Sequence, residues 1–412
     1  MLPRWIPASL LLALAPVAAL AFETVDRLPY PSDGRFPAWP ADPAGPWTIF
    51  AYGGAMYDSN LFRVQTGGES DTVARVGFGG RTLNRIVGRQ RLLLDGYGEY
   101  NDYNDFNEID HFAYGLRADW LWELGNQLDG TVRYARRKRL GDFGELRTPE
   151  RTMVSEEAVI VDGNYRFSPN WRIFAGAEHA RDKRDNDELE WLNRTSLRGG
   201  LRYRTPLANE IGIEVVGTRG EARVDVPAVG GGEVSFVDDY DQTEVAATLA
   251  YVLGAQLRIN GRVGQLERSY DNLPARDFSG VSYRALVEWL PTTRLIFSLE
   301  GYRVPRSLAD VTATHVITEG GALGVSWAAT FKLVFSARYI YEDLVYKGDP
   351  DAIRLGLGDR EDTVQTWRFG AGWEIQRHLQ IGLGYDYGER TSNLPGSGYD
   401  YELVMLNVRW EF

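Results

Sequence analysis

The chain has 412 residues, no cysteine and a formal net charge of −12. The absence of cysteine excludes disulfides and thiolate metal sites, and the acidic balance argues against nucleic acid or an anionic lipid surface as the main partner. The length predicts either two or three soluble domains or one large barrel. No run of residues beyond the N-terminal region approaches the roughly eighteen apolar residues of a membrane-spanning helix.

The N-terminal region predicts export. A short positive region, the apolar run Ile6–Leu20 and an A-x-A cleavage site at Ala19–Ala21 indicate that residues 1–21 are a cleaved secretory signal peptide. A retained membrane anchor is the alternative, but two prolines interrupt the run. Residues 22–46 hold six prolines without periodicity, so we expect an extended periplasmic segment there.

From residue 47 the chain alternates apolar and polar residues. Such alternation places successive side chains on opposite faces of a strand. Eighteen segments of this kind follow one another, and an even number returns both termini to the same side. The predicted strands are 47–58, 71–85, 90–103, 111–124, 127–140, 153–167, 171–182, 195–205, 210–223, 240–253, 255–269, 280–290, 293–304, 314–328, 331–343, 362–375, 378–389 and 399–412.

The connections between these segments sort by length. Short turns follow every even segment, as at 125–126 and 376–377, whereas long polar loops follow the odd ones, as at 140–151, 183–194 and 224–239. Short periplasmic turns and long external loops are typical of outer-membrane barrels, and a soluble sandwich has no reason for this order. We therefore predict an all-β fold for residues 47–412, a transmembrane antiparallel up-and-down β-barrel of about eighteen strands in the bacterial outer membrane, wide enough for an aqueous lumen.

The last segment ends on an aromatic residue. Val404, Leu406 and Val408 share one parity with Trp410 and Phe412. The segment resembles the closing strand of an outer-membrane barrel, in which a terminal Phe is the signal read by the barrel-assembly machinery. We expect Trp410 and Phe412 to form that signal here. A soluble edge strand is the alternative for this segment taken alone.

The sequence D-S-N-L-F-R closes the first predicted strand. It resembles a box in the β-barrel porins of bacterial exopolysaccharide-biosynthesis operons, the β-barrel porin 2-like family, which also have a signal peptide, a Pro-rich start and a terminal aromatic residue. The resemblance implies an outer-membrane location and a role in export of a capsular or slime polysaccharide. A plain Asx-type turn at a strand end is the alternative. The residues of the box are Asp58, Ser59, Asn60, Leu61, Phe62 and Arg63.

Arginines recur on the parity that faces the predicted lumen, at Arg139, Arg204 and Arg409 among others. Guanidinium groups match carboxylates and phosphates in bidentate geometry, so a ladder of them would ease the passage of an acidic sugar polymer. In this respect the chain resembles the alginate exporter type of barrel. The candidate substrate-path residues are Arg133, Arg137, Arg198, Arg202, Arg258, Arg262, Arg338 and Arg368.

Carboxylates share the same parity and offer another interpretation of these arginines. Opposite charges across a pore often pair and brace the wall, so pairing and anion conduction both stay open. The carboxylates concerned are Asp95, Glu99, Asp119, Glu123, Glu178, Glu214, Glu288, Glu300 and Glu374.

Other kinds of site find little support. The acidic segments 182–190 and 238–241 lack the spacing of a calcium loop, so we expect solvated loops, no metal site and no cofactor. The chain has four histidines and none of the common hydrolase, zinc or phosphate-binding motifs. We therefore expect that it is not an enzyme.

These patterns lead to a functional hypothesis. We expect an outer-membrane channel that assists export of an exopolysaccharide, acidic in one version of the hypothesis, through a polar lumen that contains arginine. The expected partners are outer-membrane lipid and lipopolysaccharide, the barrel-assembly machinery, the polysaccharide and periplasmic export components. Two alternatives stay open: a general or nutrient-uptake porin, and a non-transporting scaffold or adhesin that acts through its external loops.

Overall fold

The computed structural model describes residues 47–146, 149–185, 190–227, 233–272, 274, 277–306, 315–347 and 355–412. The predicted signal peptide and Pro-rich segment, residues 1–46, lie outside the described residues. No helix in the described ranges is long and apolar enough to span a membrane.

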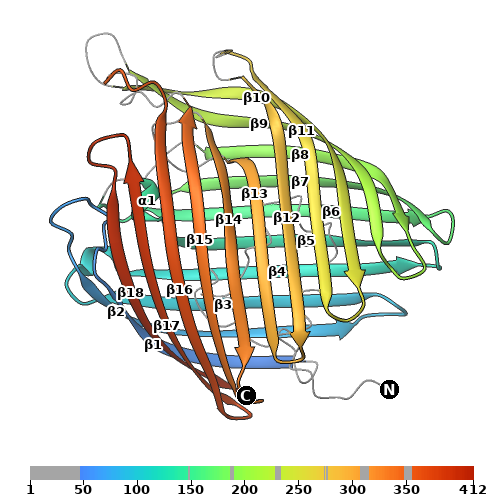
Figure 1. Cartoon of the computed structure of the whole chain (residues 1–412), viewed down its shortest axis with the longest axis horizontal. Coiled ribbons are helices and arrows are strands. Elements are labelled where there is room, and N and C mark those ends of the chain that lie inside the picture. Colours follow the sequence, from blue (N-terminus) through green and yellow to red (C-terminus); the bar gives the residue numbers. More distant parts are fainter. Residues whose placement is uncertain are drawn as a thin grey trace.

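Eighteen antiparallel strands form one closed sheet, as predicted. Each strand pairs with its neighbours in the chain, and β18 pairs with β1 to close the ring. The strands of the front wall cross those of the back wall, because the strands of a barrel tilt against its axis (Figure 1). The strands are β1 (Trp47–Asp58), β2 (Asp71–Arg85), β3 (Arg91–Tyr103), β4 (His111–Leu124), β5 (Leu128–Leu140), β6 (Met153–Arg166), β7 (Trp171–Arg184), β8 (Glu190–Arg204), β9 (Glu210–Pro227), β10 (Glu233–Leu253), β11 (Leu257–Tyr270), β12 (Phe278–Thr292), β13 (Leu295–Arg306), β14 (His315–Ala328), β15 (Leu333–Lys347), β16 (Arg360–Gln376), β17 (Leu379–Ser392) and β18 (Tyr399–Glu411).

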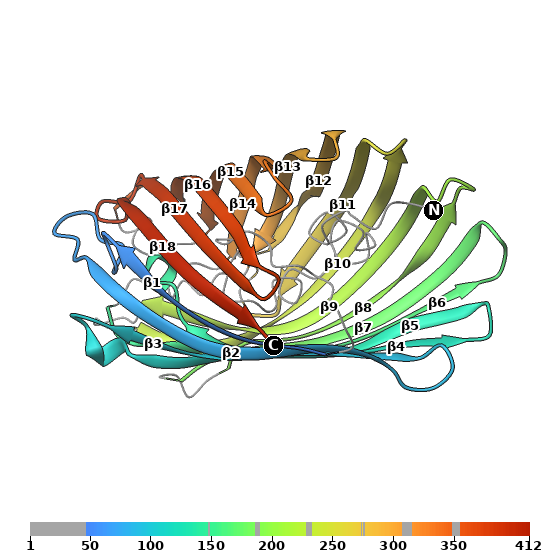
Figure 2. The ribbon, with the colours of Figure 1, turned by 90° about the horizontal axis from the view of Figure 1, so that it is seen from below.

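The seam of the barrel lies between the first and last strands, which run side by side in Figure 2. Their register extends from Asp58 opposite Leu403 to Phe50 opposite Glu411. The backbone N–H of Phe412 donates to the carbonyl oxygen of Ile49 at 2.8 Å, so the final residue also takes part in closure. Its role as an assembly signal stays a prediction.

The two faces of the wall differ as the alternation predicts. On β18, Leu403 and Met405 are fully buried, whereas Val404 and Leu406 are 49% and 44% exposed. Apolar residues that point outward without a protein partner form a surface suited to lipid. We refer to the opposite face as the inner wall.

Tryptophans mark one edge of this outer surface. Seven exposed tryptophans lie close to the end of the barrel that carries the short turns, where aromatic residues of outer-membrane barrels contact the lipid headgroups. Neighbouring rings stack there, as Trp289 does on Phe297 with 5.5 Å between ring centroids. The seven are Trp47, Trp120, Trp171, Trp289, Trp327, Trp373 and Trp410.

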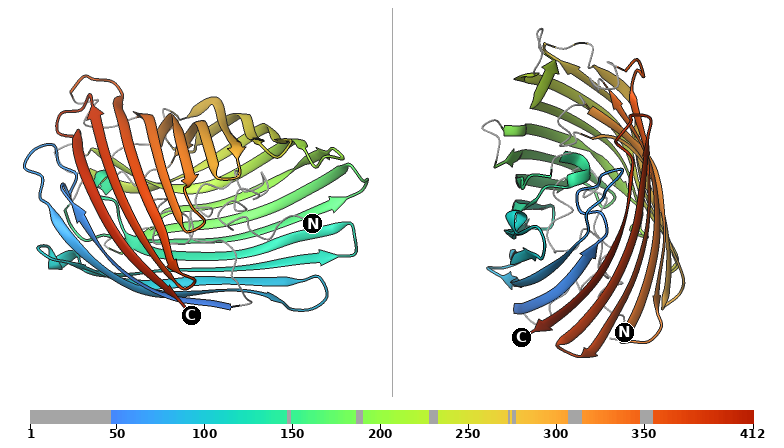
Figure 3. Two further views of the ribbon diagram at one scale, coloured as in Figure 1. Left: turned by 60° about the horizontal axis from the view of Figure 1, so that its bottom comes forward. Right: turned by 90° about the vertical axis from the view of Figure 1, so that its left-hand side faces the viewer.

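The predicted loops at 183–194 and 224–239 are wrong in extent. Strands β7 to β10 run further than the sequence indicated, and Pro227 at the end of β9 faces Glu233 at the start of β10. A hairpin that rises above the membrane has no lipid-facing side, so polar residues can continue the ladder where apolar alternation has ended. The views of Figure 3 show the wall from two further directions.

Two short helical elements interrupt the loops at the long-loop end, and the sequence did not predict them. They are η4 (Asn107–Ile109), between β3 and β4, and α1 (Phe143–Leu146), between β5 and β6. Both contribute side chains to a buried apolar cluster inside the barrel.

Candidate functional site

Ion pairs between neighbouring strands cover much of the inner wall. On β5, Arg133 contacts the carboxylate of Asp119 on β4, with 2.9 Å between Nε and Oδ1. Arg137, further along the same strand, lies 2.6 Å from Glu156 on β6. Each of these pairs joins two adjacent strands, so it braces the wall while neutralising its charge.

The arginines of β8 are held in a similar way. Nε of Arg198 donates to Oδ1 of Asp162 at 2.9 Å. Arg202 lies 3.5 Å from Glu210, and its guanidinium covers the ring of Phe174 at 3.8 Å from the centroid. Stacking of this kind fixes the plane of a guanidinium group.

On β11, one arginine contacts carboxylates from two other strands. Arg262 donates to Glu244 at 2.8 Å and lies 3.3 Å from Glu214, so one guanidinium links two carboxylates. Two more of the predicted arginines also have partners: Arg338 lies 2.7 Å from Glu300, and Arg368 lies 3.4 Å from Asp386. Arg258 faces Glu288 in the register of β11 and β12 and forms no ion pair within the part of the chain that the structure describes.

Seven of the eight candidate substrate-path arginines are therefore engaged with carboxylates of the inner wall. A guanidinium that already holds a carboxylate is less available to a passing anion. The pairing that the sequence left open as an alternative is the arrangement that the geometry displays, and a continuous ladder of free arginines is absent at these eight positions.

The D-S-N-L-F-R box lies at the long-loop end of the lumen and forms its own network. The carboxylate of Asp58 accepts two hydrogen bonds from the guanidinium of Arg63, both 2.8 Å long. It also accepts the backbone N–H of Asn60 at 3.0 Å, which is the Asx-type turn that the sequence offered as the alternative. Arg63 adopts a left-handed φ of 56° and stacks on Tyr401 at 3.9 Å. Several contacts thus hold an uncommon backbone conformation.

The middle of the box joins the first loop to the last strand. The side-chain amide of Asn60 donates to the carbonyl oxygens of Val64 and Asp400 at 2.8 and 2.9 Å. The hydroxyl of Ser59 accepts the backbone N–H of Glu402 at 2.8 Å. The box is therefore more than a local turn, since it fastens the first external loop across the seam.

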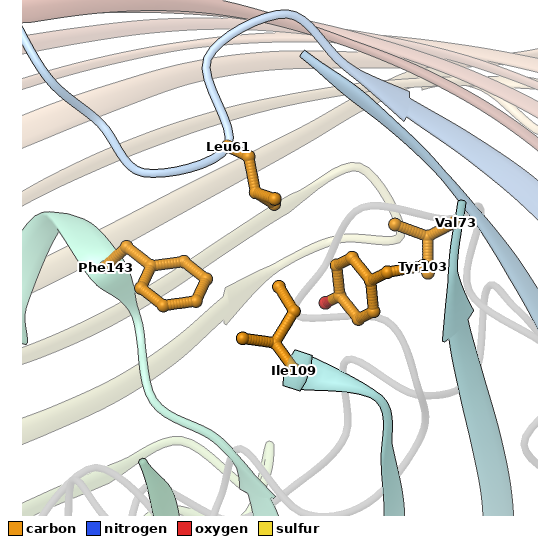
Figure 4. Close-up of a cluster of buried hydrophobic side chains, with 5 residues drawn as sticks. All are labelled: Leu61, Val73, Tyr103, Ile109 and Phe143. Carbon is orange, nitrogen blue, oxygen red and sulfur yellow. The ribbon is translucent and has the colours of Figure 1, made fainter. Parts of the chain in front are cut away.

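The two apolar residues of the box point into a cluster inside the barrel. Leu61 is buried together with Val73, Tyr103, Ile109 and Phe143, and Figure 4 shows these five side chains converging from separate elements. Three of these elements, the box, η4 and α1, belong to three different loops at the long-loop end.

Aromatic contacts complete this cluster. The ring of Phe62 packs edge-on against Phe106 and Phe143, with centroid separations of 4.9 and 5.1 Å. We call Leu61, Phe62, Phe106, Ile109 and Phe143 the inner cap. It covers inward-facing residues of β1 to β3, so it occupies part of the mouth at the long-loop end.

A buried charged group on the other side of the β1–β18 seam holds the inner cap in place. Nη1 of Arg390 on β17 donates to the carbonyl oxygen of Gly144 in α1 at 2.9 Å, and its Nε donates to Asp362 at 2.8 Å. Arg360, which is fully buried, donates to the same carboxylate at 2.6 Å and covers the ring of Tyr346. The loop between β5 and β6 therefore reaches inward to β16 and β17.

Sequence comparison identifies the second part of the chain. Residues 235–412 match the family described as "Putative beta-barrel porin 2". The match covers strands that form this closed barrel, with its apolar outer face and charged inner wall. The protein is an outer-membrane β-barrel, and its second part is similar to this porin family. The box lies before the matched residues, and no curated protein matches the chain.

Solved structures of other outer-membrane proteins have a similar fold. OccK2 (OpdF) from Pseudomonas aeruginosa in complex with glucuronate has a TM-score of 0.50 and 11% identity, over 89% of this chain and 97% of that chain. The FrpB iron transporter from Neisseria meningitidis, in its apoprotein form, also has a TM-score of 0.50, with 9% identity over 90% and 81% of the two chains. The outer membrane protein opdK from Pseudomonas aeruginosa has a TM-score of 0.47 and 11% identity, over 89% and 99%. At such identities the likeness is one of fold alone.

The sequence analysis predicted that the box lies at the first external turn and that the arginines face the lumen. It did not predict the inner-cap residues that lie outside the box. Phe143 and Ile109 stand in segments that were predicted as polar loops. The sequence did contain one indication that these residues are buried. Each is an apolar or aromatic residue in a loop of mainly charged and small residues, and exposure of such a side chain to water is unfavourable.

Proposed function

We propose that this protein is a porin, a passive channel for small polar solutes, with a lumen that narrows at the long-loop end. The inner cap is the observation that carries the proposal. Apolar side chains from three loops pack against the inner wall there, and the tether of Arg390 to Gly144 keeps α1 inward. A polymer would have to displace these contacts, whereas a small solute needs to pass only beside them.

The charge pattern of the inner wall supports the same proposal. Most of its arginines are paired with carboxylates, so the wall is polar and locally neutral rather than strongly attractive to one kind of ion. Such a wall can exchange hydrogen bonds with hydrated solutes without binding them tightly. Weak binding at several positions favours passage, because a tightly bound solute leaves slowly.

Conductance and liposome swelling test this proposal. Detergent-purified full-length protein in planar bilayers should give discrete conductance steps, and swelling rates should fall steeply from monosaccharides to trisaccharides. The absence of any conductance would favour the scaffold or adhesin alternative. If long oligosaccharides passed as fast as monosaccharides, that result would contradict a narrowed lumen.

Exopolysaccharide export, which the resemblance of the box implies, stays a prediction. A strain that lacks the protein would test it directly through the amount of polymer that it secretes. Loss of secreted polymer together with low conductance for small solutes would overturn the proposal made here in favour of export.

A further inference from the structure

Four arginines gather on the inner wall at the short-turn end of β6, β7 and β8. In the register of the sheet, Arg166 stands directly opposite Arg172, and Arg172 stands opposite Arg202. Arg204 lies two residues beyond Arg202 on the same face. These four positions place positive charge side by side on three consecutive strands, at the end of the lumen that faces the periplasm in outer-membrane barrels.

The charge of this group is only partly compensated. Among the described residues, Arg166, Arg172 and Arg204 have no side-chain ion pair, and the buried Nε of Arg166 has no hydrogen-bond partner. Arg202 contacts Glu210 at 3.5 Å. Arg172 experiences the positive charges of Arg166 and Arg204 as well as the negative charges of Glu210 and Asp129. Like charges directly opposite each other across two strands destabilise the pair.

A cavity lies against this group. It has a volume of about 540 Å³, and its lining includes Asn164, Arg166, Arg172, Phe174, Arg198 and Arg202. Sites for small organic ligands have volumes of about 300–1,000 Å³. The position of one guanidinium in the lining is fixed, because Arg202 stacks on Phe174.

We infer that this cavity is a binding site for a small organic anion, held through its carboxylate or phosphate group by Arg166 and Arg172. Guanidinium groups bind such oxygens through two parallel hydrogen bonds. The lining also holds the carboxylates of Glu123, Asp129 and Asp162, but its six arginines outnumber them, so a bound anion would offset the excess positive charge. The inference deepens the proposed function, on which it rests, because it gives the class of solute that is retained at the periplasmic end of the lumen.

The double variant R166A/R172A tests the inference. Full-length protein in detergent is titrated with glucuronate at low salt by isothermal calorimetry, and in parallel with inorganic phosphate. We expect at least about tenfold weaker glucuronate binding in R166A/R172A, because two charged contacts are lost. Weaker binding of phosphate by the same factor would assign the oxyanion as the recognised group, and unchanged phosphate binding would assign the organic carboxylate.

Two further variants serve as controls. R136A/R181A removes the same amount of positive charge from residues that the register and exposure place on the outer face, and its affinity should equal that of the wild type. R166K/R172K keeps the positive charge but lacks the planar guanidinium groups. Its affinity for glucuronate should therefore lie between those of the wild type and R166A/R172A. Retention of the folded barrel by each variant is checked by its migration in unheated gels.

The outcomes separate this site from the channel proposal. Glucuronate binding that depends on Arg166 and Arg172, in a protein that gives no conductance, would support the site and reject the channel. Affinity unchanged in R166A/R172A, or reduced equally in R136A/R181A, would overturn the site even if the protein conducts.

Discussion

Nη1 of Arg390 donates a hydrogen bond of 2.9 Å to the carbonyl oxygen of Gly144, although 246 positions separate the two residues in the chain. The contact links β17 to the loop between β5 and β6 across the inside of the barrel. The same guanidinium also donates to Asp362 on β16, so the side chain of Arg390 connects the loop to the wall. The inner cap is thereby attached to the strands next to the seam as well as to β1 to β3.

Replacing Arg390 by Ala should release α1 from the wall and raise the conductance. A hydrogen bond to a charged group contributes about 1.5–3 kcal/mol, which corresponds to a shift of about tenfold or more between inward and released loop conformations. Single-channel recording in planar bilayers measures the change. Arg390→Lys, which retains the positive charge next to Asp362, should show a smaller rise, and conductance equal to the wild type in both variants would contradict the tether.

The strands could be predicted from the sequence because one physical rule governs them. A side chain of the spanning wall faces either lipid or the lumen, so Val404, Leu406 and Val408 alternate with Met405 and Asn407 without interruption. The same rule placed the arginines on the inner wall. Outside the membrane neither face of a strand contacts lipid, so apolar and polar residues no longer alternate. The extended ends of β8, β9 and β10 were therefore predicted as loops.

The partners of these residues could not be predicted in the same way. Pairing of Arg262 with Glu214 and Glu244 depends on the register of three strands, and a shift of two residues would keep every face unchanged while changing each partner. The inner cap is harder still, since Phe62, Phe106 and Phe143 come from three loops that meet only when the barrel has closed. Arg166 and Arg172 gave a weak indication, as they flank one short turn on the lumen parity.

The ion pair inside the box should contribute strongly to the stability of the barrel. Asp58→Asn leaves the guanidinium of Arg63 without its carboxylate in a site where both side chains are at least nine-tenths buried. Breaking a buried pair of this kind costs about 3–5 kcal/mol. We expect a lower temperature for the loss of folded migration in gels. Arg294→Ala, in an exposed turn at the opposite end, is the control and should leave that temperature unchanged.

Adding a methyl group at Gly144 should disturb the inner cap from the side of β18. A Cβ at this position would meet the hydroxyl of Tyr399, so Gly144→Ala should displace α1 and increase both conductance and its fluctuations. Removing that hydroxyl gives the matched test, because Gly144→Ala combined with Tyr399→Phe lacks the closest of the three contacts. The other two, with Asp142 Oδ1 at 3.1 Å and Tyr399 Cζ at 3.2 Å, need only a small adjustment. Planar-bilayer records should then return toward those of the wild type. A double variant as noisy as Gly144→Ala alone would show that the hydroxyl is not the obstacle.

Arg262 balances two carboxylates at once, and its removal should change ion selectivity. Arg262→Ala leaves Glu214 and Glu244 facing the lumen without their shared guanidinium. The local charge changes from −1 to −2, so the reversal potential in a salt gradient should shift toward cations. The effect should fade at high salt, because ions screen charges in a water-filled lumen.

The triple variant Arg262→Ala, Glu214→Gln, Glu244→Gln provides the control for this change. It removes all three charges together, so the local net charge changes from −1 to 0 and the shift toward cations should disappear. If the single and the triple variant gave the same reversal potential, the inner-wall pairs would be irrelevant to conduction. In that event the ion path would lie along a different part of the wall, and Arg166 and Arg172 would be the next residues to exchange.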